Sequence, residues 1–245
     1  MNFIGIDLSL TSTAVSIYNK NGYFFFSYLK NWEKPTKWTK NILDYVKITG
    51  IKYKQSEVYS EQENFKLTDY SSNVNNILND IKNCLVDGKV IFGIEGYSYS
   101  SETSSLIDLV TMSTLLRNGL ITNFNAEMNV YSPSTLKKET CGLVYGWTKK
   151  GVRSIKYSTR NPDGIAGGDF QKHQMLKALN DYPCDSKLSL FIKEFFGDLY
   201  TMKSIPAPIP DLIDSYWALK VLMNEKIFHI KKIINDDAGV TDATE

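Results

Sequence analysis

The sequence has few of the residues that build disulfide frameworks or histidine-based metal sites. It contains three cysteines, Cys84, Cys141 and Cys184, and two histidines, His173 and His229. The cysteines are odd in number and far apart, which argues against a disulfide framework and against a CxxC-type zinc site. Two histidines leave few ways to build a His-rich metal centre or a serine-hydrolase triad. Any metal chemistry must therefore depend on carboxylates.

Long apolar runs and a large net charge are also missing. No stretch of about 18 uncharged apolar residues occurs, so we expect no membrane span. Residues 1–10 lack a basic region and Asp7 interrupts their apolar run, so we expect no secretion signal and a cytoplasmic protein. The formal charge of +1 does not by itself indicate a nucleic-acid-binding protein. The bias toward Lys, Asn, Ile and Tyr is compatible with an A/T-rich genome such as that of a virus.

The 42% hydrophobic content is enough for a packed core in a chain of 245 residues. The patterns predict one domain over residues 1–230 with insertions at about 31–70 and 142–168, followed by a flexible acidic tail at 231–245. Strands are expected at 3–7 continuing as one bent strand through 13–18, and at 23–29, 48–53, 89–95 and 129–131. Helices are expected at 37–45, 74–85 with a cap at Ser71 or Ser72, 104–118, 169–179 with Asp169 as the cap, 188–196 and 211–226. This order predicts an α/β fold with a central mixed sheet covered on both faces.

Two predicted strands end in a single acid, where an apolar run meets a turn of small residues. The segments are GIDLS at 5–9 and FGIEG at 92–96. If the two strands are parallel and adjacent, Asp7 and Glu95 lie together at one end of the sheet.

Asp211 and Asp214 are three residues apart near the start of the last predicted helix, so they share one helix face. Four acids could therefore converge, although each alone fits a structural or helix-capping role equally well. Repulsion and desolvation would oppose such a cluster unless cations neutralised it, and Mg²⁺ or Mn²⁺ prefers carboxylate oxygens. A two-metal phosphodiester site fits, with ions roughly 3.5–4 Å apart and Asp7 between them.

The order of these acids resembles the RuvC family of Holliday-junction resolvases, which has an acid on the first strand, a Glu on the fourth and an acidic pair beginning its last helix. Residues 132–138, SPSTLKK, are similar to the family's Pro-x-x-(apolar)-Lys segment. Residues 169–172, DFQK, are similar to the helix that carries its second functional lysine. The resemblance covers most of residues 1–30 and 72–225.

This resemblance implies a ribonuclease H-like fold, with a central mixed five-stranded sheet flanked by helices. It implies a homodimer that resolves four-way DNA junctions by symmetric hydrolysis with two Mg²⁺ ions, for which Mn²⁺ could substitute. The implied metal ligands are Asp7, Glu95, Asp211 and Asp214, with Lys172 as a further catalytic residue and Lys137 near the substrate phosphate. Three departures put junction specificity in doubt: Ser9 and residues 11–13 replace a Pro-Gly turn, residues 31–70 are longer than expected, and the 142–168 insert separates the two lysines.

The segment 137–160 is rich in basic and aromatic residues, a mixture that suits phosphate contact and base stacking. A solvated loop with incidental lysines is the alternative, and Lys138 could take the place of Lys137. Tyr97 lies where the family often places an aromatic residue near separating DNA strands, but it could equally be a packing residue. Helix 104–118, which builds the dimer interface in the family, could likewise be ordinary core. The candidate DNA-binding residues are Lys137, Lys138, Lys149, Lys150, Arg153, Lys156 and Tyr97.

Other functions remain open. A nuclease of the same fold could cut flap, branched or RNA-containing DNA, or a non-catalytic DNA-binding or scaffold protein could have kept the fold. Residues 5–13 also resemble the first phosphate loop of the sugar kinase and actin superfamily. That superfamily needs two such domains and a second Gly-rich loop, for which 245 residues are too few.

Overall fold

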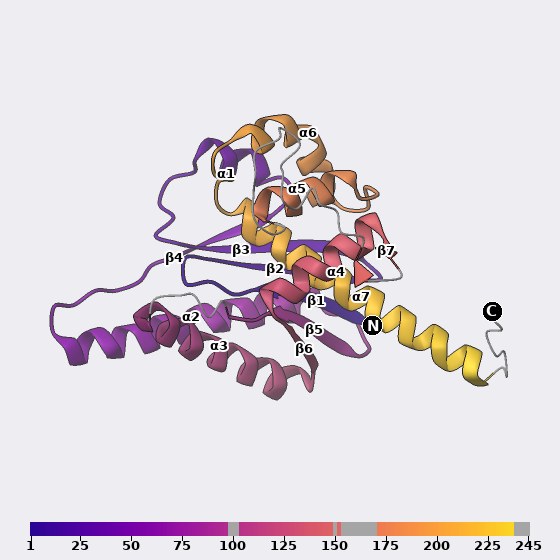
Figure 1. Cartoon of the computed structure of the whole chain (residues 1–245). Coiled ribbons are helices and arrows are strands. Elements are labelled where there is room, and N and C mark those ends of the chain that lie inside the picture. Colours follow the sequence, from indigo (N-terminus) through magenta and orange to yellow (C-terminus); the bar gives the residue numbers. More distant parts are fainter. Residues whose placement is uncertain (98–102, 149–150, 153–170, 238–245) are drawn as a thin grey trace.

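The computed structural model describes residues 1–97, 103–148, 151–152 and 171–237 (Figure 1). Its centre is a six-stranded sheet with the order β4-β3-β2-β1-β5-β6. The strands are β1 Asn2–Asp7, β2 Ser12–Asn19, β3 Gly22–Lys30, β4 Lys47–Ile51, β5 Val90–Glu95 and β6 Glu127–Tyr131. Because β2 is antiparallel to both β1 and β3 while the other pairs are parallel, five carboxyl ends lie at one edge. A central mixed sheet was predicted, but it has one more strand than the five predicted.

Helices cover both faces of the sheet, as Figure 1 shows. On one face, α2 Tyr59–Cys84 and α3 Thr103–Phe124 pack over a core that contains Ile6, Ile94 and Met112. The other face is covered by α1 Lys37–Ile42, α4 Pro133–Tyr145, α5 Lys172–Asp181, α6 Lys187–Thr201 and α7 Ile209–Asp237. Trp217 of α7 is fully buried in that second core. The predicted α/β class with helices on both faces is confirmed.

The prediction of one bent strand at 3–18 was wrong, because β1 and β2 are separate antiparallel strands. A Ser/Thr turn reverses the chain between them. The Ser9 hydroxyl accepts a hydrogen bond from the Thr11 amide at 3.2 Å, and the Thr13 hydroxyl donates to the Ser9 carbonyl at 2.7 Å. Side-chain hydrogen bonds of this kind stabilise turns without glycine or proline. The chain therefore opens with three antiparallel strands.

Two helices on the first face are longer than predicted. α2 begins at Tyr59 instead of near Ser71, and its first turns are mostly exposed, so they lack the apolar periodicity that signals a helix. α3 passes through Gly119, which was predicted to follow its last residue. A Cβ at Gly119 would lie 2.6 Å from Leu78 Cδ1, so this glycine allows α2 and α3 to pack closely and does not end the helix.

Several element ends on the second face also differ from prediction. Ser132 caps α4, and α4 continues to Tyr145, inside the predicted insertion at 142–168. A short hairpin of β7 Trp147–Thr148 and β8 Gly151–Val152 follows. Gln171 caps α5, while the predicted cap Asp169 lies outside the described residues. α7 extends to Asp237, so its last residues come from the expected tail.

The three cysteines are free in the structure. Among the described residues, no helix is both long enough and apolar enough to cross a membrane.

Candidate active site

Two parallel strands bring the first two candidate acids together. In the pairing of β1 with β5, Gly5 lies opposite Gly93 and Ile6 opposite Ile94. Asp7 follows Ile6 and Glu95 follows Ile94, so the two acids end neighbouring strands at the same edge of the sheet. The two carboxylates lie where ligands commonly bind in open α/β sheets.

The glycines of β1 and β5 allow α7 to approach the sheet closely. A Cβ at Gly5 would lie 2.0 Å from the Ser215 carbonyl oxygen, and one at Gly93 would lie 2.8 Å from the Ala218 carbonyl oxygen. Only glycine fits such contacts with a helix backbone. A buried hydrogen bond of 2.8 Å between the hydroxyls of Ser16 and Ser215 further fixes the helix on the sheet.

Side chains alternate along a strand, so Gly5 and Asp7 face the same side, as do Gly93 and Glu95. The close packing at the glycines therefore sets the first turns of α7 directly beside the two strand-end carboxylates. One carboxylate oxygen each of Asp7, Glu95 and Asp214 lie within 4.8 Å of one another. These three half-buried residues are the central acidic cluster.

The fourth candidate acid, Asp211, lies beside the central cluster. One of its carboxylate oxygens is 4.0 Å from Lys172 Nζ. Its charge contributes to raising the pKa of Asp7, which places it within electrostatic range of the cluster. Lys172 is the first residue of α5 and its side chain is exposed, so the ammonium borders the cluster from the solvent side.

Burial and mutual repulsion raise the pKa values of the clustered acids. Burial, followed by the charge of Glu95, holds the pKa values of Asp7 and Asp214 well above their ordinary range. Burial raises the pKa of Glu95 to about 7 even though Lys137 and Lys172 act in the opposite direction. The site therefore favours protonated carboxylates until a cation compensates their charge.

The donor set fits a hard divalent cation. Asp7, Glu95 and Asp214 each offer an oxygen close enough for one shared ion, and Asp211 offers another nearby. Mg²⁺ and Mn²⁺ prefer such oxygens. No histidine or cysteine belongs to this cluster, which agrees with the expectation that carboxylates carry any metal chemistry.

Only some of the predicted basic residues lie in the part of the chain that the structure describes. Lys137, half-buried on α4, lowers the pKa values of Glu95 and Asp214 and so lies within electrostatic range of the cluster, whereas Lys138 is exposed and acts on the pKa of Glu139. This difference favours Lys137 over Lys138 as the lysine beside the acids. The remaining predicted basic residues, Lys149, Lys150, Arg153 and Lys156, lie outside the described residues.

Tyr97 packs against the neighbouring helix. The Arg117 guanidinium lies over its ring, 5.2 Å from the centroid. This contact supports the interpretation of Tyr97 as a packing residue. A role of Tyr97 in DNA binding stays a prediction.

The two strand glycines are site-forming residues that the motif analysis did not single out. Each stands two positions before an acid, in the segments GID and GIE. That shared spacing was a usable signal, because it indicates a helix crossing both strands just before their acidic ends. Ser215 and Ser16 gave no such signal, since a buried serine pair has no distinctive pattern.

The sequence matches no protein-family model and no curated protein. The structure is similar to that of Thermus thermophilus RuvC, with a TM-score of 0.41, 8% identity, and coverage of 92% of this chain and 97% of that chain. It is also similar to T. thermophilus RuvC in complex with a Holliday junction substrate, with a TM-score of 0.40, 8% identity, and coverage of 92% and 96%.

Proposed function

We propose that this protein is a metal-dependent nuclease that hydrolyses phosphodiester bonds in branched DNA, with the four-way junction as its main substrate. The observation that carries the proposal is the convergence of Asp7, Glu95 and Asp214 within 4.8 Å at the carboxyl edge of the sheet. Burying three carboxylates together is unfavourable, and a structural role alone would not require it. Divalent cations bound here would compensate the charge of the three carboxylates, which gives a functional reason for the cluster.

Asp7, Glu95, Asp211 and Asp214 would hold two Mg²⁺ ions, for which Mn²⁺ could substitute. When bound, such ions activate an attacking water and stabilise the leaving oxygen. The acids themselves would repel a phosphate, so the approach of DNA depends on positive charge around them. Lys172, exposed at 4.0 Å from Asp211, and Lys137 beside Glu95 are placed to attract and orient the scissile phosphate.

The homodimer is part of the same proposal, because two sites related by a two-fold axis suit a four-way junction with two-fold symmetry. Support comes from exposed apolar residues on the outer side of α3. Ile107 is 62% exposed and Ile121 is 50% exposed, and with Val110 they fall at helical spacing. Sedimentation of wild-type protein and Ile107→Asp tests this part, with a shift from dimer to monomer expected for the variant.

The decisive experiment measures cleavage of a labelled synthetic four-way junction with Mg²⁺, with Mn²⁺ and with chelator. Wild-type protein is expected to make paired nicks with either metal and none with chelator. Asp7→Asn removes one ligand charge at nearly constant volume and should abolish cutting. Asp198→Asn, at an exposed position on α6, is the matched control and should retain activity. Undiminished Mg²⁺-dependent cleavage by Asp7→Asn would overturn the assignment.

A substrate panel separates the alternatives. Cleavage of flap, linear duplex and RNA–DNA hybrid substrates is measured alongside cleavage of the junction under the same conditions. Preference for flap or hybrid would keep the nuclease and change its substrate, as the unusual Ser/Thr turn after Asp7 and the long 31–70 segment allow. No cleavage together with no Mg²⁺ binding in calorimetry would favour a non-catalytic DNA-binding or scaffold protein.

A further inference from the structure

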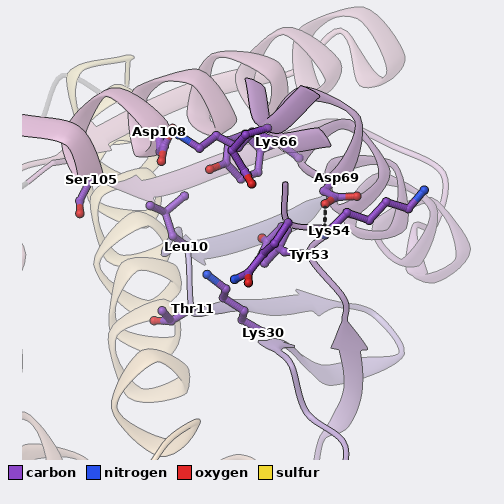
Figure 2. Close-up of a pocket in the computed structure, with 12 residues that line it drawn as sticks. Leu10, Thr11, Lys30, Tyr53, Lys54, Lys66, Asp69, Ser105 and Asp108 are labelled. Atoms are coloured by element: carbon purple, nitrogen blue, oxygen red, sulfur yellow. Dashed lines mark hydrogen bonds and ion pairs between the residues drawn. The ribbon is translucent and has the colours of Figure 1, made fainter. Parts of the chain in front are cut away.

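A pocket of about 280 Å³ opens beside the turn that follows Asp7 (Figure 2). Leu10 and Thr11 of that turn form one wall, Lys30 and Tyr53 another, and the α2 and α3 residues Lys66 and Asp108 close the pocket. The pocket lies on the α2 and α3 side of the sheet, whereas the acids face α7. Much of it comes from residues 31–70, for which the sequence offered no function.

Most charged groups around this pocket already have partners. Lys66 Nζ forms ion pairs with Glu63 at 3.0 Å and Asp108 at 3.3 Å. Asp69 accepts a hydrogen bond of 2.7 Å from the Lys54 amide, and Figure 2 shows the Lys54 side chain directed away from Lys30. These contacts compensate the charges of Lys66 and Asp69, while the Lys54 ammonium lies over the Phe65 ring, 5.6 Å from its centroid.

Lys30 faces the pocket without a carboxylate partner. Its ammonium lies 5.1 Å from the centroid of the Tyr53 ring, and the side chain is exposed. In the part of the chain that the structure describes, no carboxylate forms an ion pair with Lys30. The Tyr53 ring is itself held by an edge-on contact with Tyr70, with 5.8 Å between centroids. The Lys30 ammonium is therefore held over a fixed ring at the pocket, where it can bind an anion.

The pocket shares a sheet edge with the acidic site. Lys30 ends β3, which runs parallel to β1, and its amide donates to the Thr11 carbonyl at 2.9 Å, four residues after Asp7. β3 and β1 are two strand spacings apart, roughly 10 Å. A single DNA strand that crosses the acidic cluster can therefore also pass the pocket.

We propose that this pocket holds a backbone phosphate of the DNA, close along the strand to the bond that is cut, on the Lys30 ammonium and the Thr11 hydroxyl. The inference rests on the proposed function, because it takes the substrate to be DNA. A phosphate held here fixes the direction in which the strand crosses the acidic cluster. Residues 31–70 thereby acquire a role in positioning the substrate.

The test measures binding of labelled four-way junction by the Asp7→Asn protein in Mg²⁺, using fluorescence anisotropy at several KCl concentrations. Each phosphate contact contributes about 0.9 to the slope of log K against log salt for duplex DNA. Lys30→Gln in this background is expected to lower the slope by about that amount, and Lys30→Arg should preserve it. Lys20→Gln, at an exposed lysine in the turn at the opposite edge of the sheet, is the matched control and should leave the slope unchanged. Thermal unfolding verifies that all variants are folded.

The outcomes separate this inference from the nuclease proposal, because wild-type cleavage is measured independently. Cleavage by wild-type protein with the same slope for Lys30→Gln and Lys20→Gln would overturn the phosphate pocket alone. A specific Lys30 effect without wild-type cleavage would support the pocket and overturn the nuclease. If wild-type protein does not cut and the Asp7→Asn protein does not bind DNA, both ideas fail.

Discussion

Replacing Gly5 with alanine tests whether close packing of α7 on β1 creates the acidic site. The added Cβ would lie 2.0 Å from the Ser215 carbonyl oxygen and 2.5 Å from the Leu219 amide nitrogen, whereas ordinary contacts begin at 3.4 Å. Both obstructing atoms belong to the helix backbone and cannot rotate away. α7 must therefore move outward by more than about 1 Å, and Asp214 moves with it.

The expected cost follows from that displacement. Overpacking a core usually costs about 1–3 kcal/mol, and contacts with backbone atoms belong at the upper end of this range. Removing the backbone freedom of glycine from a strand returns roughly 0.5–1 kcal/mol. We therefore expect the free energy of unfolding of Gly5→Ala to fall by about 2 kcal/mol or more. Because a misplacement of about 1 Å can slow catalysis roughly 100-fold, DNA cleavage should fall by that order.

Urea unfolding and single-turnover junction cleavage measure the two effects. Gly197→Ala on α6 is the matched control, because a Cβ there meets no atom within 4 Å. That variant should be stabilised by about 0.5–1 kcal/mol and keep full activity, since it replaces glycine in a helix. If Gly5→Ala unfolds within about 0.5 kcal/mol of the wild type, close packing of α7 on β1 does not position the site.

Three further predictions concern the metal ligands, the lysine beside them and a distant ion pair. Asp214→Asn should weaken Mg²⁺ binding in titration calorimetry by removing one of three clustered carboxylates, and unchanged affinity would contradict the site. Lys172→Gln should slow cleavage and Lys172→Arg should restore part of it, because the charge near Asp211 is retained, so equal rates for the two variants would exclude this role. Asp185 accepts hydrogen bonds from Lys220 at 2.7 Å and from Tyr216 at 2.8 Å, so Asp185→Asn should cost about 1–3 kcal/mol in urea unfolding. Burial acts to raise the pKa of Asp185, but the hydrogen bonds from Lys220, Tyr216 and Tyr23 and the Lys220 charge together outweigh it, so the net pKa is lowered. The stability difference between wild type and Asp185→Asn should therefore be complete above about pH 5 and shrink as the pH falls below about 4, whereas a difference that grew on acidification would contradict the assignment.

The strand-end acids could be predicted from sequence because two local patterns point to one place. An apolar run that ends in an acid and a small-residue turn indicates a buried strand with a carboxylate at its edge, and β1 and β5 both have this form. Spacing of three residues placed Asp211 and Asp214 on one helix face. What the sequence could not supply was the pairing of β1 with β5, because no local pattern shows which strands are neighbours.

Residues 31–70 show why the rest was harder to predict. β4 is only five residues long and its burial is irregular, and the first turns of α2 are polar and exposed. Periodicity requires one face to be buried, so a helix that projects past the sheet carries no signal in its exposed part. Its structure depends on continuation from the buried turns near Val74 and Ile77.

The same close packing that stabilises α7 also concentrates negative charge at its start. Trp217 and Leu219 on this helix are fully buried, and Asp214 lies one to two turns before them. Their packing opposes the repulsion of Asp214 by the strand-end acids Asp7 and Glu95. Divalent cations would relieve that repulsion, so adding Mg²⁺ should stabilise the fold as well as support catalysis. The position of α7 on the sheet thus determines both the packing of its buried apolar residues and the distance of Asp214 from the strand-end acids. A substitution anywhere along the β1–α7 contact should therefore change folding stability and metal affinity together.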